Sequence, residues 1–178
     1  AGTSINLNSG NYIEGYGGYG TLTAPVVNLM AVNDIGWDSG GVNTQASTVT
    51  ASTTGAYGRI IIANNGNAAG PVNVTLNSAT DDVYFTNQGN VVMTGSNSAA
   101  GNYSLTANSG SILQGSSGLI TANAVNLYAD NSIGTSSSPI QIQATYLTAN
   151  ANGGDAWMTT AGDITLAGNN SASGIYGL

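Results

Sequence analysis

The sequence of 178 residues contains no cysteine, no histidine and no lysine, and its only basic residue is Arg59. The absence of cysteine excludes disulfide bonds and thiolate chemistry, and the absence of both cysteine and histidine excludes the usual nucleophilic triads. Phosphate groups are neutralised by cations, so we expect no nucleic-acid partner. Electrostatic docking on anionic lipid is disfavoured for the same reason.

Long apolar runs and proline are also scarce. No run approaches the ~18 apolar residues of a membrane helix, so we expect no membrane insertion. The chain begins at Ala1 without a basic or hydrophobic leader, and we expect any signal peptide to have been removed or to lie outside this segment. Charged residues are only 5% but apolar residues reach 41%, in short regular runs rich in β-branched and aromatic types, which favours strands over disorder.

Internal repeats organise the chain. The stretch GNVVMTGSNSAAGNYSL at 89–105 aligns without a gap with GDITLAGNNSASGIYGL, which follows 73 residues later at 162–178. A shared pattern of one polar, three apolar and three small or polar residues, then Gly and Asn or Asp, occurs at 59–67, 82–90 and 155–163. Self-similarity at a fixed spacing is the sequence signature of repeat architectures.

A second set of matches lies 98 residues apart. We therefore expect one domain over residues 1–178, built from about two copies of a module of ~98 residues. The segment 172–178 loosely resembles 1–7, so the chain ends near the phase of the module at which it starts. The matches at 98 residues are Val27-Asn28-Leu29 with Val125-Asn126-Leu127, Ile35-Gly36 with Ile133-Gly134, and Thr50-Ala51 with Thr148-Ala149.

Apolar residues alternate with period two in segments such as 72–76, 140–142 and 164–166, which is typical of strands, and no segment sustains a helical period. A β-sandwich has no reason to repeat its sequence at 73 or 98 residues, whereas a solenoid does. We predict an all-β parallel β-solenoid with almost no helix, with turns of roughly 20 residues and therefore about eight or nine turns. We expect the repeated segments to lie above one another, with Asn side chains bonded from turn to turn.

The chain resembles the passenger repeats of bacterial exoproteins of the filamentous-haemagglutinin type, which are exported by two-partner secretion. The resemblance covers nearly the whole chain, and it implies a right-handed parallel β-helix that is secreted or displayed on the bacterial surface and works in adhesion to host cells, to other bacteria or within biofilms. The matching motifs are the Leu-Thr-Ala runs at 22–24, 105–107 and 147–149, Ser-Gly-Ser-Ile at 109–112, Ile133-Gly134 followed by Ser138-Pro139-Ile140, and Gly-Asp-Ile-Thr-Leu at 162–166.

The acidic residues and Arg59 could serve in catalysis or metal binding, or they could be solvated turn residues. Lyases with this fold need basic residues and only Arg59 is present, while hydrolases need convergent carboxylates. Asp82 and Asp155 share a repeat position with Arg59, which favours a tolerant turn site and not an enzyme. Asp81 and Asp82, or Asp34 and Asp38, are weak candidates for calcium ligands, and we expect no cofactor.

Aromatic residues give the strongest candidates for binding. Tyr12, Tyr16 and Tyr19 lie in the glycine-rich stretch YIEGYGGYG, and Trp37 lies in IGWDSGG without an aromatic counterpart in the second copy. These four side chains could form a sticky or sugar-stacking surface. By contrast Ile61, Tyr84 and Trp157 share one repeat position, so we expect them to be structural.

These observations predict a structural or adhesive rod segment that is not an enzyme. Its partners would be glycans or proteins of host cells or matrix, or further copies of itself, joined end to end or laterally. The first alternative is a subunit of an extracellular filament that stacks head to tail. The second alternative is a carbohydrate-active β-helix enzyme.

Overall fold

A computed structural model describes residues 3–15, 20–37, 40–65 and 70–178 and shows a parallel β-solenoid with no helix in these ranges. All pairings between its strands are parallel.

The strands form two faces of the solenoid, which we call face A and face B. Face A contains β1 (Ser4–Ser9), β3 (Val26–Ala31), β5 (Thr48–Thr53), β7 (Val72–Ser78), β9 (Val91–Met93), β10 (Ser96–Ser98), β12 (Ile112–Gln114), the first parts of β13 (Leu119–Ala129) and β14 (Ile140–Ala151), β15 (Ala156–Thr160) and β18 (Tyr176–Gly177). Face B contains β2 (Thr21–Thr23), β4 (Val42–Gln45), β6 (Ile60–Asn64), β8 (Val83–Gln88), β11 (Asn102–Asn108), the second parts of β13 and β14, β16 (Thr165–Leu166) and β17 (Ser171–Ala172).

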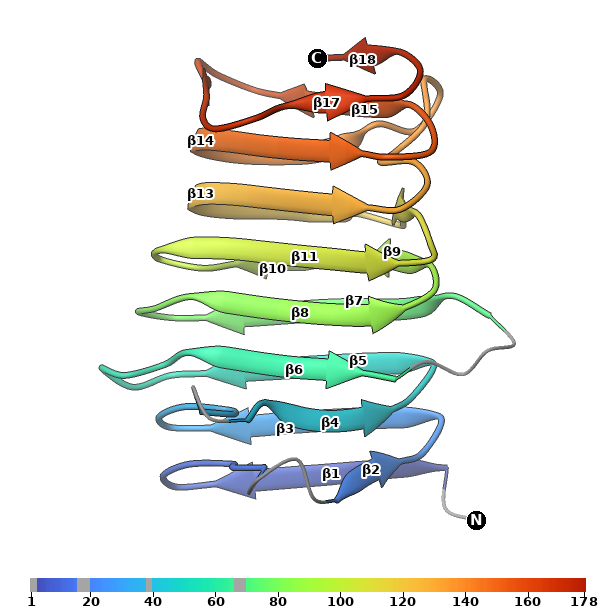
Figure 1. The fold of residues 1–178 in the computed structure, drawn as a ribbon. Helices are drawn as coiled ribbons and strands as arrows, with labels where there is room; N and C mark the ends of the chain where they lie inside the picture. The colour runs from blue at the N-terminus through green and yellow to red at the C-terminus, as the bar shows by residue number, and fades with distance from the viewer. Residues whose placement is uncertain (1–2, 16–19, 38–39, 66–69) are drawn as a thin grey trace.

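The chain winds upward as a right-handed coil (Figure 1). Strands β4, β6 and β8 run from left to right in front, and the face A strands return behind them. The predicted fold class is therefore confirmed. There are about seven turns, not eight or nine. The turns are longer than expected because loops lengthen some of them: Ser4 pairs with Val26, and Thr48 pairs with Asn73.

The repeated segments lie on opposite faces, and the expectation that they stack directly is wrong. Val27 lies on face A, paired with Val49, whereas Val125, 98 residues later, lies on face B, paired with Tyr103. Tyr103 in turn recurs after 73 residues as Tyr176, which lies on face A. Both spacings therefore correspond to a half-integral number of turns, about 4.5 and 3.5. The two faces share one sequence pattern, so the same short segment can form either half of a turn of the solenoid.

The core is a column of inward side chains along the axis. Strands β7 and β11 alternate strictly between buried and half-buried residues, as the period-two pattern predicts. Val49 pairs with Val74 on face A, and Phe85 pairs with Leu105 on face B, and each of these side chains is at most 1% exposed. Stacking like on like removes apolar surface from water along the whole rod.

Three buried polar residues form a ladder inside face B. Thr44, Asn64 and Asn87 are paired in register on successive turns and are each at most 1% exposed. The Thr44 hydroxyl donates to Asn64 Oδ1 at 2.8 Å, and Asn64 Nδ2 donates to Asn87 Oδ1 at 2.8 Å. Asn64 Oδ1 also accepts the Ala46 N–H at 3.0 Å, and Asn64 Nδ2 donates to the Ala46 carbonyl at 3.2 Å. The expectation that Asn side chains bond from turn to turn is confirmed here.

A second asparagine motif explains the repeat at 73 residues. Asn97 Oδ1 accepts the Leu76 N–H at 2.8 Å and the Tyr103 hydroxyl at 3.0 Å. Its counterpart Asn170 accepts the Ala149 N–H at 2.8 Å and the Tyr176 hydroxyl at 2.9 Å. The same corner is thus built twice, once on each side of the rod, and this requires the same Asn and Tyr at the same spacing.

Alkaline pH should destabilise the protein through Tyr103. Burial raises the pKa of Tyr103 above its ordinary value near 10, so the folded state holds the proton more tightly than the unfolded chain. This contribution is complete below pH ~10, and it falls by about 1.4 kcal/mol per pH unit above that, as the unfolded tyrosine ionises. Denaturant unfolding at pH 7 to 11 should show this decline.

The matched variants are Tyr103→Phe and Tyr57→Phe, because Tyr57 is 69% exposed. Tyr103→Phe loses the hydrogen bond to Asn97, about 1 kcal/mol at pH 7, and should decline less steeply above pH 10. An alkaline slope that Tyr103→Phe leaves unchanged would contradict the assignment.

Candidate functional site: an aromatic and arginine cluster on face B

The stacking of three turns brings Tyr12, Trp37 and Arg59 together. Tyr12 precedes Ile13 in the chain, Trp37 follows Ile35 and Gly36, and Arg59 precedes Ile60. Ile13 bridges to Ile35, and Ile35 bridges to Ile60, in one parallel column. Residues far apart in sequence therefore lie at one corner of face B. We call Tyr12, Trp37 and Arg59 the aromatic cluster.

The geometry of the aromatic cluster is well defined. The ring centroids of Tyr12 and Trp37 are 6.5 Å apart, with the rings at 88°. The Arg59 guanidinium carbon lies 5.9 Å from the centroid of the Trp37 ring. An edge-to-face aromatic pair and a cation over an indole are both attractive arrangements. Trp37 nevertheless remains 46% exposed and Tyr12 39% exposed, so both rings offer surface to a partner.

A loop that leaves the solenoid at Gly36 presents Trp37. Gly36 has φ +84°, and a Cβ there would lie 2.3 Å from the Ile61 carbonyl oxygen of the next turn, so only glycine fits. Trp37 N donates to the Gly40 carbonyl at 3.2 Å, and Gly40 N donates back at 2.9 Å. These bonds tie the main chain of Trp37 to that of Gly40.

The same loop geometry recurs on face A, although its aromatic residue does not. Gly134 has φ +62°, and its Cβ would lie 2.3 Å from the Trp157 carbonyl oxygen. Thr135 and Ser138 exchange backbone hydrogen bonds of 3.1 and 3.0 Å, as Trp37 and Gly40 do. The rod therefore presents two loops of related construction on opposite faces, one aromatic and one rich in hydroxyl groups.

The predicted site residues are brought together only in part. Tyr12 and Trp37 meet as described, whereas Tyr16 and Tyr19 lie outside the described residues. Arg59 was not predicted to belong to the site, because the sequence marks it only as an aligned turn residue. Its place at the start of the Arg-Ile-Ile-Ile run gives no signal that Trp37 lies beside it on the preceding turn.

Turn aspartates, including the weak metal candidates Asp34, Asp81 and Asp82, accept backbone N–H groups, whereas the candidate Asp38 lies outside the described residues. Asp82 Oδ1 accepts the Asn102 N–H at 2.6 Å, and Asp155 Oδ1 accepts the Ile175 N–H at 2.9 Å. Asp34 does the same for the Arg59 N–H at 2.8 Å. Asp81 Oδ1 accepts the N–H of its neighbour Asp82 at 2.9 Å. These contacts support the reading of the four acids as turn residues.

The repeat position of Ile61, Tyr84 and Trp157 is structural, as expected. Ile61 pairs directly with Tyr84 on the next turn. The Tyr84 hydroxyl donates to Asp82 Oδ2 at 2.8 Å, and Trp157 Nε1 donates to Asp155 Oδ2 at 3.4 Å. Burial, and next the hydrogen bond to Asp82, raise the pKa of Tyr84, so the phenol stays protonated.

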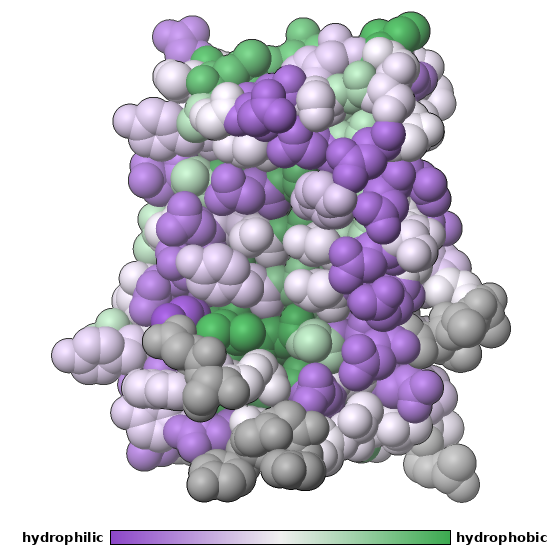
Figure 2. Space-filling view, in the orientation of Figure 1, coloured by the Kyte–Doolittle hydropathy of each residue, from purple (hydrophilic) through white to green (hydrophobic). Residues whose placement is uncertain are grey.

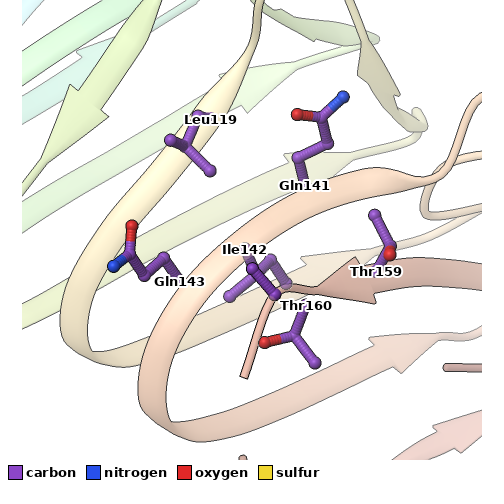
Figure 3. Close-up of a pocket in the computed structure, with 7 residues that line it drawn as sticks. Leu119, Gln141, Ile142, Gln143, Thr159 and Thr160 are labelled. Carbon is purple, nitrogen blue, oxygen red and sulfur yellow. The ribbon is translucent and has the colours of Figure 1, made fainter. Parts of the chain in front are cut away.

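The remaining surface offers hydroxyl and amide groups. The view in Figure 2, onto face B, is largely hydrophilic or neutral, with hydrophobic residues confined to smaller areas. A shallow pocket of about 300 Å³ lies at β13, β14 and β15, where Gln141 and Gln143 flank Ile142 and Thr159 and Thr160 complete the wall (Figure 3). These groups can exchange hydrogen bonds with a ligand, but they include no acid or base for catalysis.

Within the ranges that the structure describes, no three acids group into a possible metal site. The same ranges contain no helix of the length and hydrophobicity needed to cross a bilayer. Searches of protein-family models, curated proteins and solved structures found no match to this chain.

Proposed function

We propose that the chain is a structural and adhesive rod segment of a secreted or surface-displayed bacterial exoprotein of the filamentous-haemagglutinin type, exported by two-partner secretion. The observation that carries this proposal is the aromatic cluster, held on the side of a stiff solenoid. Parallel turns at ~4.8 Å give a rod about 35 Å long for about seven turns. Solenoids of this kind present extended binding surfaces along their length.

Composition supports an extracellular interfacial role and not catalysis. The acids Asp34, Asp82 and Asp155 are engaged by backbone N–H groups, and the flank is polar with few charges. Loops on opposite faces would let one rod contact two partners, which suits adhesion between surfaces. Trp and Tyr are enriched where proteins bind other molecules, because their rigid rings supply contact area at low entropic cost.

Two measurements test this proposal. Antibodies raised against the chain should label intact producing cells or the culture medium, and beads coated with the purified chain should adhere to host cells or to bacteria. Labelling only after permeabilisation would contradict the location, and beads that adhere no better than beads coated with heat-denatured chain would contradict adhesion.

The alternative of a head-to-tail filament is favoured by the two ends of the described solenoid. Leu7 is 38% exposed at one end, and Leu166 and Leu178 are 50% and 54% exposed at the other. Both β1 and β18 belong to face A, so a second copy could continue the strand ladder there. Electron microscopy of the purified chain should then show filaments, whereas monodisperse short rods would rule against this alternative.

A further inference from the structure

We propose that the aromatic cluster binds an uncharged hexopyranose unit of a glycan. This inference deepens the proposed adhesive function by naming a ligand class for its site. It begins from the shape of the pair: the rings of Tyr12 and Trp37 stand at 88° with centroids 6.5 Å apart. Two perpendicular rings form a corner with an apolar floor and an apolar wall. A pyranose ring is of similar width, and its C–H face can lie on one ring while its edge meets the other.

Exposure and rigidity support recognition at this corner. Trp37 is 46% exposed although it stands beside two other side chains, so the surface it keeps is available without rearrangement. The backbone bonds between Trp37 and Gly40 hold its main chain, and the Tyr12 ring and the Arg59 guanidinium, 5.9 Å from its centroid, pack against its indole. A preorganised aromatic surface loses little conformational freedom when a ligand binds.

Polar groups that suit sugar hydroxyls adjoin the pair in the chain. Asn11 precedes Tyr12, and Asn33 Nδ2 donates to Asn11 Oδ1 at 2.7 Å across neighbouring turns. A carboxamide has two N–H donors and an acceptor oxygen with two lone pairs, so this bond does not exhaust the pair. Small-molecule sites combine an apolar surface with a few such groups.

Charge decides which sugars fit. The chain carries eight acids and one base, with a formal net charge of −7. Asp34 is buried and accepts the backbone N–H of Arg59, so a carboxylate lies next to the one basic residue of the aromatic cluster. The single positive charge of Arg59 is offset locally by Asp34 and outweighed by the acids of the whole chain, so a uronate or sialate gains no net attraction, whereas a neutral pyranose loses nothing.

The test combines a glycan array with tryptophan fluorescence. The array carries oligosaccharides of glucose, galactose, mannose and N-acetylhexosamines beside uronate-containing and sialylated ones. The purified chain should bind neutral oligosaccharides and not their acidic counterparts. Trp157→Phe leaves Trp37 as the only tryptophan, so the best neutral binder should change the fluorescence of this variant with an affinity equal to that of the unchanged protein.

Matched variants locate the site. Trp37→Ala should weaken binding at least tenfold, and Tyr12→Ala should weaken it several-fold, with unchanged circular dichroism because both side chains are exposed. Trp37→Phe should restore part of the loss, since a ring is retained. Binding of no neutral glycan, binding of acidic glycans only, or full affinity in Trp37→Ala would each overturn the proposal. If beads coated with Trp37→Ala still adhered, the proposed adhesive function would stand, but it would not depend on a glycan bound at the aromatic cluster.

Discussion

Replacing Asn64 with alanine should lower the free energy of unfolding by about 4 kcal/mol, since each buried group left unpaired costs about 1–3 kcal/mol. Asn64 is 1% exposed and bonds with Thr44 below it, Asn87 above it and the backbone of Ala46. Truncation at Cβ removes all of these partners at once. The methyl group that remains cannot replace them, and the adjoining turns lose their polar link inside the core. Denaturant unfolding followed by circular dichroism measures the loss.

The control for this prediction is Asn123→Ala, at an exposed position on another turn. Surface substitutions of this kind are usually within about 0.5 kcal/mol of neutral. If Asn64→Ala were no more destabilising than Asn123→Ala, the buried ladder from Thr44 to Asn87 would not contribute as described.

Gly110→Ala is the second large change that we expect, with a loss of about 3 kcal/mol, at the upper end of the usual 1–3 kcal/mol for overpacking. A Cβ at Gly110 would lie 2.2 Å from the Gly89 carbonyl carbon and 2.6 Å from Asn90 N. The obstacle is backbone, which cannot rotate away as a side chain can. The two turns would have to separate at this corner, and ladder hydrogen bonds nearby would lengthen.

Gly162→Ala is the matched control, because no heavy atom lies within 4 Å of a Cβ built there. Thermal unfolding of both variants should show a large decrease in melting temperature for Gly110→Ala and little change for Gly162→Ala. Equal melting temperatures would mean that the turns do not approach each other at Gly110 as the structure shows.

The fold could be predicted because the strands and turns of a solenoid are specified by short segments of sequence. Period-two runs such as 72–76 give strands, and the repeats require a stack of similar turns. The half-turn relation could not be read from the sequence, because a match of Val27 with Val125 is equally compatible with stacking on one face or alternation between two. Only the count of residues in each intervening turn distinguishes them, and turn lengths vary with loops such as the one after Gly36.

The candidate site was predictable to the extent that its residues break the repeat. Trp37 has no aromatic counterpart in the second copy, and Tyr12 lies in an unusual glycine-rich stretch, so both stood out. Arg59 did not, because it occupies an ordinary turn position and reaches Trp37 only through the column of Ile35 and Ile60. Contacts between turns depend on register, which the sequence leaves open.

The central claim is that adjacent turns stack in parallel while the 98-residue repeat alternates faces, and pyrene excimer fluorescence tests it most directly. The chain has no cysteine, so labels can be placed at will. Ser104 and Asn126 are paired on adjacent turns at ~4.8 Å, so the double cysteine variant labelled with pyrene should show excimer emission. Asn28 and Asn126, 98 residues apart, lie on opposite faces about 4.5 turns, or ~20 Å, apart along the axis, and should show none beyond a mixture of single-labelled chains. Excimer emission from the second pair and not the first would contradict the account.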